Sequence, residues 1–374
     1  MNKVVALIIS LAACAPLFAA PNATPNGASN GASKGASKNA TTKNTVVTEI
    51  VNNLVNEGVQ FHEQGQYDEA IAKYKQAEKK APKNALVKYE MAFSYHAKHE
   101  NDKALSYAKA AAKLDTKNLN ENLYSLMGTI YDEKGMPDSA IAVYRKGFEK
   151  EPNSFNIPYN ATITYMRQNN ADSAYAWVKR SINNSRIHEG SYYYAGFIAS
   201  LMGKWPQFYA YSMYSTFITK KDDIIRDNLS RLYGKTKYLV QKEGDELKLN
   251  SPNVKQTGSD STVNKEFLLS LQTMFATDSI GTRKLYDKDS TSAQQTEFLI
   301  YILEKSIKLI AFTDEIDDPI QRFYQGLIRN RLVDAFIYTI CEPIDRPTFA
   351  QWLIKNRSEQ TRLYQWFNKE WLML

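Results

Sequence analysis

Small and apolar residues recur at helical spacing along much of the chain, and polar residues fill the positions between them. The stretch GQYDEAIAKYKQAEKKAP, residues 65–82, shows the pattern clearly, because Ala70, Tyr74 and Ala77 recur every three or four residues among Lys, Glu and Gln. Residues with this spacing share one face of a helix. The stretch therefore predicts an amphipathic helix that ends before Pro82.

The segments between the predicted helices carry turn signals. EQGQYDE, EKGMPDS and QNNADS each place Gly or Asn at a helix end, followed by Asp or Ser as the cap of the next helix. Such short connections predict antiparallel helical hairpins.

The hairpin pattern repeats with a nearly constant period. The first small residue of each copy is Gly58, Ala92, Gly128, Thr162 or Gly196, so successive copies are 34, 36, 34 and 34 residues apart. A period near 34 is typical of a helix-turn-helix solenoid. Each hairpin would bury its apolar face only against its neighbours, so stability would be shared along the stack.

These residues resemble the tetratricopeptide repeat (TPR) family over about residues 48–220. The family motif is a small residue, an aromatic, a second small residue and a helix-ending proline, and two copies match it well: Gly58, Phe61, Ala70 and Pro82, and Gly128, Tyr131, Ala140 and Pro152. The second copy has Thr116 in place of the proline, and the fifth has Phe208 in place of the second small residue. The resemblance implies an all-α solenoid of about five hairpins.

The resemblance also implies a groove that binds a protein or peptide. In this family the first helices line the groove, through residues six and three before, and one and four after, the small residue. Exposed aromatics there would bury much area on binding. The predicted site residues are Tyr89, Phe93, His96, Tyr159, Ile163, Tyr193 and Phe197. If the C-terminal region covers them they are core instead, and the sequence leaves both interpretations open.

Residues 1–20 have the features of an export signal. Lys3 precedes an apolar run that is shorter than the ~20 residues of a spanning helix, and small residues follow. Two processing sites compete. The lipobox-like LAAC would make Cys14 a lipidated N-terminus, whereas a general signal peptidase would cut near Ala19 or Ala20.

Residues 21–47 contain three Gly-Ala-Ser units and few large apolar side chains. This composition predicts a flexible low-complexity linker. Together with the signal, it predicts an exported protein of the bacterial periplasm or outer membrane, either soluble or a lipoprotein.

The period stops near residue 221, and residues 221–374 are predicted to form a second all-helical module. The polar stretch near 243–262 predicts a loop. Helical spacing then returns near 263–276, 291–313, 318–341 and 346–373. The last segment carries Trp352, Trp366 and Trp371, which indicate either buried core or a face that stacks on sugar rings.

Composition narrows the function class. The chain has 374 residues, 43% hydrophobic and 23% charged, which is enough apolar content to fold. A formal net charge of +7 is too diffuse to indicate nucleic-acid binding. The only cysteines are Cys14 and Cys341, so no intrachain disulfide is expected after processing, and the apolar surroundings of Cys341 predict a buried thiol.

Candidate chemistry is sparse. YGKT at 233–236 lacks the first glycine of a phosphate-binding loop, and HEQGQ at 62–66 lacks the second histidine of a zinc helix. His62 and His96 occupy equivalent positions, where a polar role is favoured over a metal site or a pH-sensitive contact. A hidden enzyme would need a carboxylate pair such as Glu315 and Asp317. We expect no catalytic residues, no metal and no cofactor.

The sequence thus predicts an exported, non-catalytic TPR scaffold that binds a protein or peptide partner in an envelope assembly. The alternative is a glycan-binding accessory protein of polysaccharide uptake.

Overall fold

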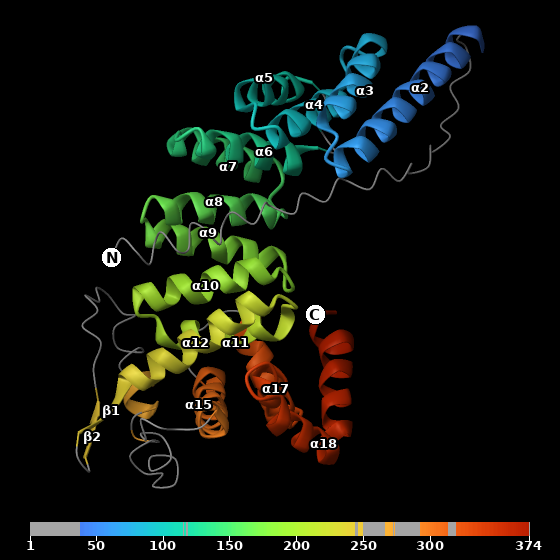
Figure 1. Cartoon of the computed structure of the whole chain (residues 1–374). Coiled ribbons are helices and arrows are strands. Elements are labelled where there is room, and N and C mark those ends of the chain that lie inside the picture. The colour runs from blue at the N-terminus through green and yellow to red at the C-terminus, as the bar shows by residue number, and fades with distance from the viewer. Residues whose placement is uncertain are drawn as a thin grey trace. The chain divides into compact units, whose positions relative to one another are not determined.

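The computed structural model describes residues 38–114, 116, 119–243, 246–249, 266–271, 273, 292–312 and 319–373. They belong to two compact units, Met1–Asn170 and Ala171–Leu374, which are coloured in chain order in Figure 1. The predicted export signal, Cys14, Glu315 and Asp317 lie outside the described residues.

The first unit consists of helices arranged as consecutive antiparallel hairpins. They are α2 (Lys38–Glu63), α3 (Tyr67–Lys80), α4 (Ala85–Ala97), α5 (Asn101–Ala111), α6 (Asn120–Glu133), α7 (Pro137–Lys150) and α8 (Asn156–Arg167). The all-α prediction is confirmed. Helix α2 begins inside the segment predicted as linker.

The hairpin turns repeat the period of the sequence. One residue in each turn has a left-handed backbone, with φ between 57° and 76°; these residues are Gly65, His99, Gly135, Asn169 and Gly203. They are spaced 34, 36, 34 and 34 residues apart. Glycine and asparagine adopt this conformation most readily, which explains the turn signals in the sequence.

Close approach of the two helices depends on a residue pair separated by 16 positions. A Cβ atom built on Gly58 would lie 2.3 Å from the Tyr74 ring, and one built on Gly128 would lie 2.1 Å from the Tyr144 ring. The second hairpin instead uses Ala92 and Ala108, both fully buried. Glycine therefore stands opposite tyrosine in the first and third hairpins, and alanine opposite alanine in the second.

The outer face of the first hairpin is polar over the second half of α2. In the second and third hairpins, three positions of the first helix are buried and pack on the preceding hairpin. They lie five residues before, one residue before and two residues after the small residue: Val87, Met91, Ser94, Leu123, Met127 and Ile130. The same positions of the first hairpin are exposed and polar: Asn53, Glu57 and Gln60. Earlier on the same face of α2, Val46 and Ile50 are exposed, so the face is polar only toward the C-terminal end of the helix.

The second unit contains the helices α9 (Ala171–Asn184), α10 (Glu189–Met202), α11 (Trp205–Ile218), α12 (Asp222–Leu239), α15 (Ser292–Phe312), α16 (Pro319–Arg329), α17 (Val333–Cys341) and α18 (Arg346–Trp366). A π-helical turn, η1 (Phe367–Trp371), follows α18, and residues 266–271 are also helical. An antiparallel ribbon of β1 (Val240–Glu243) and β2 (Glu246–Leu249), which the sequence did not predict, follows α12 (Figure 1).

Helix α11 is the centre of the second unit. All its residues from Phe208 to Thr216 are buried, and it packs against α10, α12, α15, α16 and α17. A helix that is apolar on every side must be covered on every side. The fifth hairpin still closes tightly despite Phe208, because Gly196 lies against Ser212, where a Cβ would be 2.6 Å from the hydroxyl.

Helix α12 continues the repeat spacing by one helix. Ser230 lies 34 residues after Gly196, and the positions that face the preceding hairpin carry buried apolar residues: Ile225, Leu229 and Leu232.

Further on, the predicted segment 318–341 is two helices, not one. Arg331, with φ 56°, turns the chain between α16 and α17.

Tyr214 joins the C-terminal segment to the fifth hairpin. Trp371 Nε1 donates to the Tyr214 hydroxyl at 2.8 Å, and this hydroxyl donates to the Arg186 carbonyl at 2.8 Å. Arg186 in turn donates to the Trp371 carbonyl at 2.8 Å, and its guanidinium lies 5.0 Å from the Trp371 ring. The last helical turn is therefore part of the core, with Trp371 only 2% exposed.

The glycine–tyrosine pair makes a direct prediction about stability. Gly128→Ala should destabilise the protein by about 1–3 kcal/mol, because its Cβ overlaps the Tyr144 ring. Adding Tyr144→Ala reproduces the alanine pair of the second hairpin, so the double variant should be more stable than the sum of the single effects implies. Urea denaturation measures all three variants.

Gly234→Ala is the matched control, because a Cβ at this helical position meets nothing within 4 Å. It should leave stability unchanged or raise it slightly. If the free-energy changes of the Gly128 and Tyr144 substitutions simply add in the double variant, the two side chains do not compete for the same volume.

The C-terminal turn makes a second prediction. Trp371→Ala should cost about 3–5 kcal/mol in unfolding free energy, because it empties a buried site and leaves the Tyr214 hydroxyl without its donor. Met373→Ala, at a residue 81% exposed, is the control and should have little effect. Equal midpoints in thermal denaturation would place Trp371 outside the core.

Candidate functional site

The predicted site residues of the first unit lie on the first helices of its hairpins, α4 and α8. Phe93, His96, Tyr159 and Ile163 are half-buried, so part of each side chain is accessible. Tyr89 is only 1% exposed and belongs to the core. We define the first-helix face as four positions on each of α2, α4, α6 and α8. They lie six and three residues before, and one and four residues after, the small residue of that helix.

A stack of rings forms one end of the first-helix face. The His62 ring is stacked on Phe93, with centroids 4.6 Å apart and an interplanar angle of 18°. Phe93 is parallel to Tyr89 at 6.1 Å, and the edge of Tyr67 meets His62 at 5.1 Å. Phe93 is thus held in place by the core residue Tyr89 and keeps part of its ring accessible.

His62 is a neutral part of this stack. Its Nδ1 atom lies 2.8 Å from the Ser94 hydroxyl, within hydrogen-bond distance. Burial lowers the pKa of His62, and the nearby Glu63 carboxylate offsets only part of that effect. The ring can therefore pack on Phe93 without placing a charge on the face.

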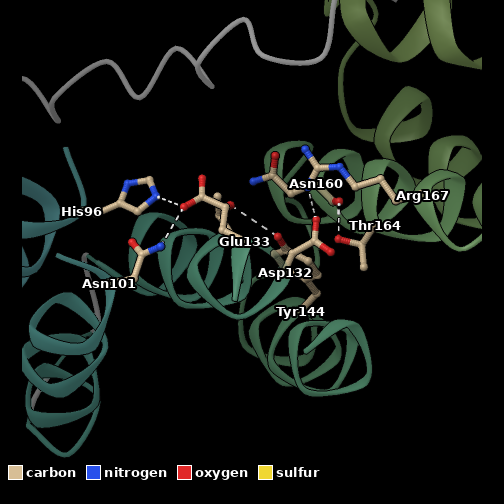
Figure 2. Close-up of polar contacts among 9 residues, drawn as sticks. His96, Asn101, Asp132, Glu133, Tyr144, Asn160, Thr164 and Arg167 are labelled. Carbon is tan, nitrogen blue, oxygen red and sulfur yellow. Dashed lines mark hydrogen bonds and ion pairs between the residues drawn. The ribbon is translucent and has the colours of Figure 1, made fainter. Parts of the chain in front are cut away.

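A hydrogen-bonded pair and an ion pair link successive first helices, as Figure 2 shows. His96 Nε2 lies 3.0 Å from Glu133 Oε2, which also accepts from Asn101 Nδ2 at 3.3 Å. Arg167 of α8 pairs with Asp132 of α6. The polar side chains of His96 and Asp132 on this edge of the face are therefore already engaged within the chain.

The environment of Glu133 shows how these contacts balance burial. Burial alone would raise the pKa of Glu133, but the hydrogen bonds from His96 and Asn101 and the Arg167 charge together lower it. The carboxylate stays ionised at neutral pH and holds its two partners.

His62 and His96 do not face one another. The first lies against Ser94 and the second against Glu133, so their equivalent sequence positions do not make a shared site. Across the described residues, no group of three or more His, Cys, Asp or Glu side chains is placed to hold a metal ion.

The remaining first-helix face of the first unit is apolar or uncharged. Its half-buried members are Val59, Leu86, Phe93, Asn122, Thr129, Tyr159, Ile163 and Met166. Asn156 also lies here and donates to Glu121 Oε1 at 2.8 Å. The arrangement is suited to contact with apolar groups and backbone amides of another chain.

The predicted site residues of the second unit are packed against their own chain. Arg231 of α12 lies 4.9 Å from the Tyr193 ring and 5.3 Å from the Phe197 ring. Its Nη2 atom is 2.8 Å from Asp227 Oδ2 and donates to Asn228 Oδ1 at 2.8 Å. Phe197 is 9% exposed. Sequence analysis missed Arg231, although its position 35 residues after Gly196 was a usable signal.

A serine–histidine contact in the second unit joins side chains at the packing of α9 on α10. His188 Nδ1 lies 2.7 Å from Ser191 Oγ, and Ser191 Oγ lies 2.6 Å from Ser181 Oγ. Burial lowers the pKa of His188 to about 4, and both Ser181 of α9 and Ser191 of α10 are fully buried. The cluster fastens α9 to α10.

The tryptophans do not form an open pair. Trp366 is 8% exposed and Trp371 is 2% exposed, so both are core. Trp352 stacks on Tyr338 at 4.9 Å with an interplanar angle of 10°. Cys341 is a buried free thiol, and burial raises its pKa to about 12.

A sequence model described as TPR repeat matches residues 58–98. This range begins at Gly58 in α2 and ends directly after α4. The chain contains tetratricopeptide repeats. Arrays of this family are in general non-catalytic scaffolds that bind proteins or peptides. No curated protein matches the chain.

Solved TPR structures overlay on about half of the chain. A thermophilic TPR protein of Thermus thermophilus is 18% identical, with 49% of this chain and 98% of that one covered at a TM-score of 0.40. YrrB, described as a TPR protein with an unusual peptide-binding site, is 16% identical, with 51% and 97% covered at 0.38. PilF of Pseudomonas aeruginosa is 12% identical, with 52% and 93% covered at 0.45. Likeness at this level carries no functional information.

Among the described helices, none is both long enough and apolar enough to cross a bilayer.

The Asp132–Arg167 pair should contribute measurably to the packing of α6 on α8. The Asp132 side chain is only 8% exposed, so Arg167→Ala should cost about 1–2 kcal/mol by leaving a shielded carboxylate without its cation. A double-mutant cycle with Asp132→Ala should give a coupling energy near ~1 kcal/mol.

The Lys98–Asp68 pair is the matched control, because Asp68 is 78% exposed. Its coupling should fall within experimental error. Equal coupling for the two pairs would mean that burial does not strengthen the Asp132–Arg167 contact.

Proposed function

We propose that the chain is an exported, non-catalytic TPR scaffold that holds a protein or peptide partner in a bacterial envelope assembly. The observation that carries the proposal is the first-helix face of the first unit. There, half-buried apolar and aromatic side chains recur from hairpin to hairpin, next to charges that are already paired. The N-terminal sequence supports export, by general secretion or by lipidation of Cys14.

Phe93 is the natural anchor for the partner. It is rigid, because Tyr89 and His62 hold its ring, and a rigid aromatic loses little entropy on binding. Ile163 provides a second apolar contact two hairpins further along. The His96–Glu133 contact and the Asp132–Arg167 ion pair engage the charged side chains at this edge, so recognition would depend on apolar burial and on hydrogen bonds to backbone amides.

The proposed binding surface lies within the first unit. Tyr193 and Phe197, the other two predicted aromatic contacts, already pack on Arg231. The glycan alternative predicts an exposed planar pair at Trp352 and Trp366. The burial of Trp366 gives that interpretation no support.

The proposal is tested by capturing partners from detergent-solubilised envelope of the source cells. The full-length chain, a Phe93→Ala/Ile163→Ala variant and a Met136→Ala control are compared by affinity purification and mass spectrometry. Met136 is 43% exposed in the α6–α7 turn, away from the first-helix face. A specific partner should be retained by wild type and control and reduced at least tenfold in the double variant, with unchanged circular dichroism.

Equal capture by all three proteins would show that the first-helix face is not the binding surface. If the double variant loses helical content, Phe93→Leu, which keeps the volume nearly constant, replaces it, and a still-reduced capture then supports the proposal.

A further inference from the structure

A buried carboxyl lies where the second hairpin packs on the first. Glu90 of α4 is 3% exposed, and among the described residues it takes part in no ion pair. Ser94, one turn further along α4, meets His62 of α2. The Tyr74 ring of α3, which fills the space beside Gly58, is close enough to Glu90 and Ser94 to interact with both. Glu90 thus belongs to a polar cluster between three helices.

The third and fourth hairpins provide an internal comparison. Tyr144, Asn160 and Thr164 are each 70 residues after Tyr74, Glu90 and Ser94, and Tyr144 fills the space beside Gly128 just as Tyr74 does beside Gly58. Asn160 is 7% exposed and Thr164 is fully buried, and Figure 2 shows both on α8 next to Tyr144. The same packing therefore holds a neutral amide at one hairpin contact and an ionisable carboxyl at the other.

The groups around Glu90 do not compensate its charge. From α3 it faces the Tyr74 phenol, and from its own helix the Tyr89 phenol. The groups of α2 near this cluster are His62, which is neutral, and Glu63, which carries the same charge as an ionised Glu90. No positive group in the described part of the chain pairs with Glu90. Ionising this carboxyl therefore places an uncompensated charge between the hairpins.

We propose that Glu90 is a proton-controlled contact: the first hairpin is packed on the second when this carboxyl is protonated, and the contact loosens when it ionises. The device is local, since the equivalent contact between the third and fourth hairpins carries Asn160. The loosening affects the contact between α2 and α4, the helices that carry the stacked rings of His62 and Phe93.

The direction of the pH effect follows from burial. Burial raises the pKa of Glu90 to about 7, above the value of about 4.3 for an unfolded glutamate. Since the folded pKa is the higher one, the stabilising contribution is complete below about pH 4.3 and is lost as the pH rises through 7. Hairpin packing should weaken from pH 6 to pH 8.

The test is hydrogen–deuterium exchange of the full-length chain, read by mass spectrometry on peptides of α2 and α3. Wild type and Glu90→Gln are compared at pH 5.5, 6.5, 7.5 and 8.5, so that the intrinsic pH dependence of exchange cancels. For peptides of α2 and α3, the equilibrium constant for local opening in wild type is divided by that of the Glu90→Gln variant at each pH. This ratio should rise by on the order of tenfold between pH 5.5 and pH 8.5. Peptides of α6 and α7 should show a constant ratio.

A ratio for α2 and α3 that stays constant with pH would overturn the proposal. If Glu90→Gln does not fold, Glu90→Asn supplies the residue of the fourth hairpin instead. A converse variant, Asn160→Asp, should transfer pH-dependent opening to α6 and α7, and its failure to do so would also count against the mechanism. No partner is needed, so the outcome is independent of the proposed scaffold function.

Discussion

Close packing of the two helices in each hairpin is the constraint on which the rest of the array depends. In the first and third hairpins it requires glycine opposite tyrosine, with no room for even one more carbon atom beside Tyr74 or Tyr144. The tyrosine that fills the space beside the glycine also interacts with the next hairpin: Tyr74 with Glu90 and Ser94, and Tyr144 with Thr164. One steric choice within a hairpin thereby sets the chemistry of the contact between hairpins.

Sequence spacing alone predicted the hairpins and their small residues, because a fixed steric pair must recur wherever two helices meet in the same way. It also located the turns, since a left-handed residue favours glycine or asparagine. The split between α16 and α17 was missed because Arg331 is neither. The ribbon after α12 was missed because VQKE and ELKL are too short and too polar for a strand pattern.

The candidate site was only partly predictable. Position in the repeat places Phe93 and Tyr89 on one helix face, but Tyr89 is buried, whereas Phe93 stays half-buried with His62 of the first hairpin stacked on it. Tyr193 and Phe197 have the same two positions in the fifth hairpin, yet Arg231 lies over both. Whether a side chain is available depends on residues from the next helix, and a periodic pattern within one helix holds no information about them.

The polar outer face of the first hairpin has a consequence for assembly. Repeat arrays with apolar ends can stack end to end, since each terminus offers the surface that the next hairpin would cover. Asn53, Glu57 and Gln60 remove that surface from the second half of α2, whereas Val46 and Ile50 stay exposed earlier in the helix. Burying them against a second molecule would desolvate two amides and the ion pair that Glu57 makes with Lys73. Head-to-tail stacking through these three positions is therefore disfavoured.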